Sequence, residues 1–476
     1  MGLKKQVVNS AKWNTIATFF NMGLAFLKIA VLTRILERSD FGLVAIASVV
    51  IGFTSIFSDL GLTIAIIHKQ DTTKEQYSSL YWTNVILSIV LYIVLLCATP
   101  LISSFYNEPI LNEIVPLLGV EILANAFGKM FQTLKMKALD FKFISIVNVS
   151  SSVIGFVFTI ILALSGWGIY SLVLGQLLTV IFVQVVYFIS GCKTTQITFH
   201  LNFLEIKEYL SIGLYQLGAR IIDYIAGKVD VFLIGHFWGM DALGVYNLAK
   251  DLLQKPCAIL FKIVDSILTS AYAKIQNNAR NMKIQYIRVS KMLSTFFIPV
   301  CVGFYVFADI IVKIAYGNVF HDAAAIMQAL VLFEIINNIQ KSANPIRTSL
   351  GRTDLSFVWA LVTFVSTMAV VLIVKDTSIL TLAWGLSVVN VITLIPYWRI
   401  ALKRTIGIGF KDFMETFMPC FAMSLLIGGG IYLILGIWNT LLSNIVLFIV
   451  YLILLLSVFS VLDMNYVKQI LSIRKS

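Results

Sequence analysis

The chain has 476 residues, of which 59% are hydrophobic and 13% are charged, and its mean hydropathy is +0.91. A membrane-spanning helix needs about 20 mostly apolar residues, and stretches of that kind take up most of this chain. This composition excludes a large soluble domain.

About fourteen apolar stretches follow one another, separated by short polar loops. The first continues from the basic N-terminus to about Leu36 without a small-residue cleavage site, so we expect an uncleaved first span. The sequence therefore predicts an all-α polytopic membrane protein with about 14 transmembrane helices. The expected spans are residues 11–36, 41–67, 78–104, 114–134, 143–165, 168–190, 209–237, 242–272, 289–315, 323–344, 355–374, 379–398, 413–436 and 440–462.

Positive charges are distributed unevenly between the two sides of these spans. Of the 36 lysines and arginines, ten lie in the interior of the expected spans, Lys12 and Lys291 lie at their cytoplasmic ends, and only Arg38 and Lys375 lie in loops opposite the N-terminus. The others lie in loops and tails on the N-terminal side. This positive-inside bias predicts that both termini are cytoplasmic. It also explains the net charge of +12 without nucleic-acid binding.

Catalytic chemistry finds little support in the sequence. The external loops are short, at residues 104–113, 165–168, 375–378 and 436–439, whereas an enzyme working on the outer face usually needs a sizeable external domain. No nucleotide-binding or nucleophile-elbow motif occurs in its strand–turn–helix context. The five cysteines and four histidines lack metal or redox spacing. We therefore expect no enzyme, no metal and no cofactor.

A faint internal repeat suggests how the spans are organised. Residues 33–47 (TRILERSDFGLVAIA) resemble residues 235–249 (GHFWGMDALGVYNLA), so that Gly42 matches Gly244. Both segments lie at the external end of a span that starts in the cytoplasm, as in parallel repeats. This predicts two six-helix lobes in parallel pseudo-repeat around a central cavity, plus two peripheral helices. The expected parts are an N-lobe at 1–190, a cytoplasmic lobe connector at 191–208, a C-lobe at 209–400, and spans 13 and 14 with a cytoplasmic tail at 401–476.

Polar side chains form stripes on several expected spans, at the spacing of one helix face. Because lipid offers no hydrogen-bond partners, these faces must meet protein or water. Contacts between packed helices explain the neutral stripes. Charges join the stripes of spans 1, 2, 4, 7 and 8, which favours a water-filled cavity. Four acids there are candidates for ion coupling or ion pairs, namely Asp59, Glu121, Asp223 and Asp230.

Ten basic residues lie inside expected spans, where each costs about 2.5–3.5 kcal/mol or more near the bilayer centre. A cationic interior suggests an anionic cargo. The ten are Lys28, Arg34, Lys129, Arg220, Lys228, Lys250, Lys255, Lys262, Lys313 and Lys341.

Five of the ten are candidate substrate-binding residues of a cationic cavity. Lys28 has no acid three or four residues away and is the best candidate for a free interior cation. Arg34 lies near the external end of the first span, where its side chain can equally bind substrate or snorkel to the membrane surface. For Lys228, a role in substrate binding and a purely structural role are equally open. Arg220 can equally form a local ion pair with Asp223. Lys255 precedes Pro256, which we expect to kink or open its span.

Three segments carry a resemblance to a known family. They are RILERSDFGLVAIA, KALDFKFISIVNVSSSVIG and DVFLIGHFWGMDALGVYNLAKDLLQKP. With them the chain resembles the polysaccharide transporter branch, the Wzx-like flippases, of the multidrug/oligosaccharidyl-lipid/polysaccharide exporter superfamily. The resemblance implies a bacterial plasma (inner) membrane flippase for a lipid-linked glycan carried on polyprenyl pyrophosphate. It implies proton or sodium coupling in some members, and membrane lipid and polysaccharide assembly machinery as partners.

Physical chemistry agrees with that implied cargo, because arginine offers a bidentate fork for pyrophosphate and lysine a mobile point charge. Other hypotheses stay open. One is a cation-coupled drug or metabolite exporter of the same fold, for which an acidic or aromatic cavity would be expected. Another is a peptidoglycan-precursor flippase. A membrane glycosyltransferase or polymerase fits less well, because the external loops are short.

Overall fold

The computed structural model describes residues 3–59, 66, 72–193, 195, 197–276, 278–437, 446–451, 453 and 454. Every regular element in these residues is a helix, which confirms the predicted all-α class. The chain forms two compact units, residues 1–245 and 246–476, which we call unit 1 and unit 2.

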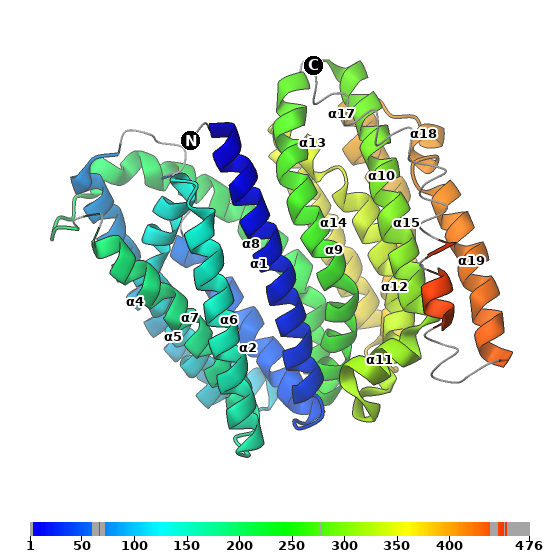
Figure 1. The fold of residues 1–476 in the computed structure, drawn as a ribbon, viewed down its shortest axis with the longest axis horizontal. Helices are drawn as coiled ribbons and strands as arrows, with labels where there is room; N and C mark the ends of the chain where they lie inside the picture. The colour runs from blue at the N-terminus through cyan, green and yellow to red at the C-terminus, as the bar shows by residue number, and fades with distance from the viewer. Residues whose placement is uncertain are drawn as a thin grey trace. The chain divides into compact units, whose positions relative to one another are not determined.

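Unit 1 is a bundle of long helices in which α5 is central. Helix α5 packs against α2, α4 and α7, while α1 packs against α6 and α8 packs against α2 and α4 (Figure 1). The first residues of α9 complete the unit. The bounds are α1 Leu3–Leu32, α2 Arg38–Asp59, α4 Lys74–Tyr106, α5 Leu111–Lys137, α6 Phe141–Leu164, α7 Ile169–Cys192, α8 Phe203–Phe237 and α9 Gly239–Ile275.

Unit 2 contains the rest of α9 and is built around α12, which packs against α10, α11 and α15. Helix α19 packs on α10, and α14 packs on α15. The bounds are α10 Ala279–Val306, α11 Ala308–Tyr316, η1 Asn318–Phe320, α12 Asp322–Lys341, α13 Asn344–Ser349, α14 Thr353–Val374, α15 Ile379–Ile392, α16 Leu394–Tyr397, η2 Trp398–Lys403, α17 Arg404–Ile406, α18 Phe410–Met414 and α19 Met418–Ile437.

Side-chain caps mark where several helices begin. Thr73 and Gln76 form a capping box at α4, with hydrogen bonds of 3.3 Å and 3.2 Å in the two directions. Asp140 caps α6 by accepting from the Phe143 amide, and Ser378 caps α15 by accepting from the Thr381 amide. These side chains satisfy backbone N–H groups that have no partner within the helix. The loops between the spans are therefore sharply defined.

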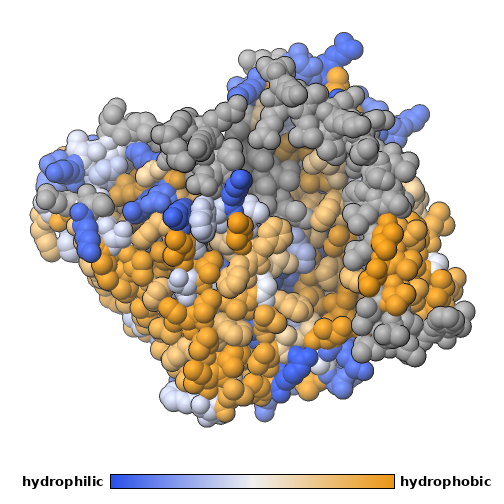
Figure 2. Space-filling view, in the orientation of Figure 1, coloured by the Kyte–Doolittle hydropathy of each residue, from blue (hydrophilic) through white to orange (hydrophobic). Residues whose placement is uncertain are grey.

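Eleven described helices are long and apolar enough to cross a membrane. Helices α8 and α9 have 35 and 37 residues, so at 1.5 Å per residue they also exceed the roughly 30 Å of a bilayer core. Figure 2 shows a broad hydrophobic surface. Helices α4 and α6 carry exposed apolar side chains such as Ile93 and Ile161. The protein is a multi-pass membrane protein. Most of the expected span at 440–462 lies outside the described residues.

The structure corrects one expected span and shows a local irregularity in another. The stretch 289–315 divides at Phe307 into α10 and the short α11, whose Ala308, Val312 and Ala315 are buried on one face. Lys313 is exposed on α11. The expected span 379–398 lies within one candidate membrane span, Ile379–Ile406. Its helix is irregular at Thr393, three residues before Pro396, whose ring and missing N–H disfavour a regular helix. Helix α9 continues through Pro256, which therefore does not end it.

Candidate substrate cavity in unit 1

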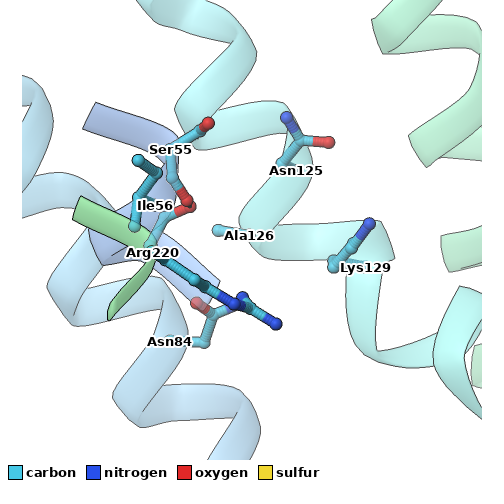
Figure 3. Close-up of a pocket in the computed structure, with 8 residues that line it drawn as sticks. Ser55, Ile56, Asn84, Asn125, Ala126, Lys129 and Arg220 are labelled. Carbon is cyan, nitrogen blue, oxygen red and sulfur yellow. The ribbon is translucent and has the colours of Figure 1, made fainter. Parts of the chain in front are cut away.

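A cavity of about 320 Å³ lies inside unit 1, between α2, α4, α5 and α8. Two of its lining residues are cations, Lys129 from α5 and Arg220 from α8. The others are neutral, and four of them carry hydroxyl or amide groups. The full lining is Ser55, Ile56, Ser58, Asn84, Asn125, Ala126, Lys129 and Arg220 (Figure 3).

Helix geometry brings these side chains together. Asn125 and Lys129 are four residues apart, so they share one face of α5, and Ala126 leaves space between them. Ser55 and Ser58 come from the last turns of α2. Arg220 and Asn84 both line the cavity, from α8 and α4 (Figure 3). The cavity is therefore assembled from four helices that are distant in the sequence.

A polar contact from a fifth helix holds Asn125 in place. The Nε2 atom of Gln184 on α7 donates to the Oδ1 atom of Asn125 at 2.6 Å. Gly128 permits this approach, because a Cβ there would lie 2.2 Å from the Gln184 Oε1 atom and 2.7 Å from its Cα atom. With its Oδ1 accepting from Gln184, Asn125 presents its amide N–H donors in other directions.

One polar atom in the lining has no protein partner. Asn84 is only 9% exposed, and its buried Oδ1 atom accepts no hydrogen bond from the described residues. A buried carbonyl without a partner is costly, so it is expected to accept from water or from a hydroxyl group of a ligand. The cavity thus combines positive charge with neutral groups suited to a hydrated molecule.

The charge of the cavity is positive, because the eight lining residues include Lys129 and Arg220 and no acid. Glu121 lies on the same helix as Lys129 but does not line the cavity. It is buried at 7% exposure, and its Oε1 atom has no hydrogen-bond partner among the described residues. The side chain of Asp59, another of the four predicted acids, lies outside the described residues. The side chain of Lys262 in α9 lies outside them too.

The other predicted site residues of unit 1 are spread over its helices. Lys28 is half-buried on α1 and has an interaction partner, so the expectation that it is a free cation is wrong. Arg34 is exposed just beyond α1 and donates to the Ala30 carbonyl. On α8, Lys228 and Asp223 are exposed, whereas Asp230 is buried at 5%.

Lys255 belongs to unit 2, where it has an acidic partner one turn away. Its Nζ atom lies 2.7 Å from the Oδ2 atom of Asp251. This ion pair was not among the sequence-based expectations for Lys255. The spacing of four residues could have revealed the pair, because side chains at that spacing meet on a helix.

A buried acid in unit 2 was not among the predicted site residues. Glu334 on α12 is 1% exposed, and its Oε2 atom accepts from Gln254 at 3.1 Å and from Asn337 at 3.4 Å. Its Oε1 atom lies 3.9 Å from the Nζ atom of Lys341. Lys341 follows by seven residues on the same helix face, which is the signal that could have found this acid.

Most of the cavity lining was not among the predicted site residues. Lys129 was expected only as one of the ten interior cations. Asn84 lies on α4, whose strongly apolar sequence gives no sign of a polar site. Arg220 is the one substrate-binding candidate that the structure places in this cavity.

Comparison with known proteins defines the class of this membrane protein. Residues 31–325 match the family model described as polysaccharide biosynthesis protein. The match covers more than half of the chain, so the chain belongs to this family.

Two relatives align over most of their length. The chain is 27% identical to the teichuronic acid biosynthesis protein TuaB of Bacillus subtilis over 431 residues, covering 90% of this chain and 89% of TuaB. It is 24% identical to the lipopolysaccharide biosynthesis protein WzxC of Escherichia coli, covering 89% and 87% of the two chains. The predicted Wzx-like resemblance is confirmed.

Solved structures share the fold at low sequence identity. The lipid II flippase MurJ in an inward closed conformation superposes with a TM-score of 0.75 at 16% identity, covering 94% of this chain and 98% of that one. An inward-facing MATE family transporter of the MOP superfamily gives 0.59 at 13% identity, covering 87% and 98%. The fold is therefore that of a polytopic transporter.

Proposed function

We propose that this protein is a flippase that moves a lipid-linked oligosaccharide or polysaccharide repeat unit, carried on polyprenyl pyrophosphate, across the bacterial inner membrane. The observation that carries the proposal is the cavity lined by Lys129 and Arg220 without an acid among its eight lining residues. Membership of a polysaccharide biosynthesis family supports a glycan cargo.

The chemistry of the lining suits both parts of such a head group. Arginine can bind phosphate oxygens with a planar fork and lysine with a point charge. Asn84, Asn125, Ser55 and Ser58 supply the neutral donors and acceptors that hydroxyl-rich sugars need. A volume near the lower end of the usual range for ligand pockets, about 300–1,000 Å³, suits part of a head group while the prenyl tail stays in lipid.

The proposal includes alternating access, with the N-lobe at 1–190 and the C-lobe at 209–400 joined by the connector at 191–208. It also includes cytoplasmic termini and transport without covalent change of the cargo. The internal repeat supports the lobes, and the charge bias supports the orientation. The solved structures that share the fold are a flippase and a drug transporter. The candidates for coupling to a proton or sodium ion are Asp59, Glu121, Asp223 and Asp230, of which Glu121 and Asp230 are buried.

The test uses purified protein in liposomes that contain a polyprenyl-pyrophosphate oligosaccharide, with an impermeant glycosidase to detect sugar on the outer face. Arg220→Ala and Lys129→Ala should each slow translocation about 10- to 150-fold, because a lost hydrogen bond to a charged group is worth about 1.5–3 kcal/mol. Arg220→Lys should keep part of the rate, since the charge remains.

The matched control is Lys135→Ala. Lys135 lies on α5 like Lys129, but it sits in the last turn, 3.5 Å from Asp140, and it does not line the cavity. Its translocation rate should stay near that of the unchanged protein. Normal translocation by the Lys129→Ala/Arg220→Ala double variant would refute the proposal. Export of a lipophilic cation, at a rate that the double variant leaves unchanged, would favour the drug exporter instead.

A further inference from the structure

Tyr224 on α8 contacts α2 one helical turn from the cavity. Its hydroxyl donates to the carbonyl oxygen of Val49 at 2.9 Å, and its ring centroid lies 6.3 Å from that of Phe53. Tyr224 follows Arg220 by four residues, so both side chains lie on the same face of α8. The residue that contacts α2 and the residue that enters the cavity are therefore part of one rigid segment.

Gly52 provides the space that Tyr224 occupies. A Cβ atom at Gly52 would lie 2.2 Å from the Tyr224 hydroxyl oxygen and 3.0 Å from its Cζ atom. Any larger residue at this position would push the ring away from α2. The Tyr224 side chain fills the space left by the missing Gly52 side chain, and this contact fixes where α8 crosses α2.

The register of this contact determines where Arg220 lies. Tyr224 meets α2 at Val49 and Gly52, while Arg220 lines the cavity with Ser55 and Ile56, one turn further along α2. A shift of α8 by one residue would turn its side chains by about 100° and move them by about 1.5 Å. Such a shift would take the guanidinium out of the cavity.

We propose that Tyr224, seated on Gly52 and bonded to Val49, is the positioning residue that holds the Arg220 guanidinium in the cavity. The consequence for transport rests on the proposed function. The geometric claim does not, because the position of residue 220 can be measured without any cargo. Tyr224 itself is not a lining residue of the cavity.

The geometric test measures labelling of an Arg220→Cys variant by an anionic methanethiosulfonate reagent, read residue by residue with mass spectrometry. Adding Tyr224→Phe should change the labelling rate at position 220 at least about threefold, the effect of losing one ordinary hydrogen bond. The exposed native Cys192, the last residue of α7, serves as the internal reference. An unchanged rate at position 220 would overturn the proposal.

The matched control is Tyr92→Phe in the same background. The Tyr92 hydroxyl also donates to a backbone carbonyl, that of Pro116 at 3.4 Å, and its ring also lies against a glycine, Gly119. This contact joins α4 to α5 and does not involve α8. Tyr92→Phe should leave labelling at position 220 unchanged, and an equal change in both variants would overturn the specific role of Tyr224.

The transport test combines the two partners. Gly52→Ala should lower translocation more than Tyr224→Phe, because the added methyl meets the hydroxyl. Removing that hydroxyl opens part of the space for the methyl group. The Gly52→Ala/Tyr224→Phe double variant should therefore translocate faster than the rate expected from multiplying the two single-variant effects. Independent effects would overturn the pairing. If labelling follows Tyr224 but Arg220→Ala translocates normally, the positioning role stands and the proposed function fails.

Discussion

Gly42 of α2 and Gly244 of α9 meet in a reciprocal backbone contact within unit 1. A Cβ atom at Gly42 would lie 2.1 Å from the carbonyl oxygen of Met240, and a Cβ atom at Gly244 would lie 2.1 Å from the carbonyl oxygen of Arg38. The spacing from Arg38 to Gly42 equals that from Met240 to Gly244. The two matched glycines of the internal repeat thus perform the same task, because only a residue without a side chain lets these helix ends touch.

Alanine at either glycine should destabilise the protein. Backbone oxygens cannot move as a side chain can, so we expect Gly42→Ala and Gly244→Ala each to cost about 1–3 kcal/mol, as overpacking does. Thermal unfolding in detergent and membrane abundance measure this. Gly23→Ala on α1 is the control, because a Cβ there has nothing within 4 Å. If all three variants unfold at the same temperature, the close contact has no energetic weight.

The loops at the two ends of α5 should face opposite sides of the membrane. Asn107 ends α4 in a left-handed conformation, and Lys137 ends α5. We expect Asn107→Cys to react with an impermeant thiol reagent added to intact cells and Lys137→Cys to react only after permeabilisation, because basic loops stay in the cytoplasm. Reaction of both positions in intact cells would contradict the proposed orientation.

Lys255 should matter less for transport than Lys129 and Arg220. It is paired with Asp251 and its side chain is 48% exposed, and helix pairs of this kind are worth only about 0.3–0.5 kcal/mol. Lys255→Gln should keep translocation within about twofold. The same liposome assay decides this, with Asp251→Asn as the companion variant. A loss as large as that of Arg220→Ala would make Lys255 a substrate contact after all.

Glu334 should contribute more to stability than its partner Lys341. The carboxylate is almost fully buried and accepts from two amides, whereas the Lys341 side chain is 40% exposed and 3.9 Å away. Glu334→Ala leaves the donors of Gln254 and Asn337 without an acceptor, which should cost about 1–3 kcal/mol. Lys341→Ala should cost about 1 kcal/mol or less. Thermal unfolding compares the two, and the reverse order would contradict this reading of the cluster.

The amino-acid sequence by itself determined the class of protein. Apolar stretches of spanning length specify helices in a membrane, because only satisfied backbones are stable in lipid. Local signals also place many ends, such as Thr73 before α4 and Asp140 before α6. The repeated glycines at 42 and 244 were visible as a match. These features depend on residues close in the chain, and so local patterns reveal them.

Only the tertiary structure decided which charges share a cavity. Helical spacing assigns a residue to a face but does not say which other helix that face meets. Lys129 and Arg220 come from α5 and α8 and line one cavity, while Lys255 has its acid on its own helix and Lys313 is exposed on the short α11. The rotation and register of each helix depend on packing, as the contact of Tyr224 with Gly52 shows. That packing decides which interior cations can meet a substrate.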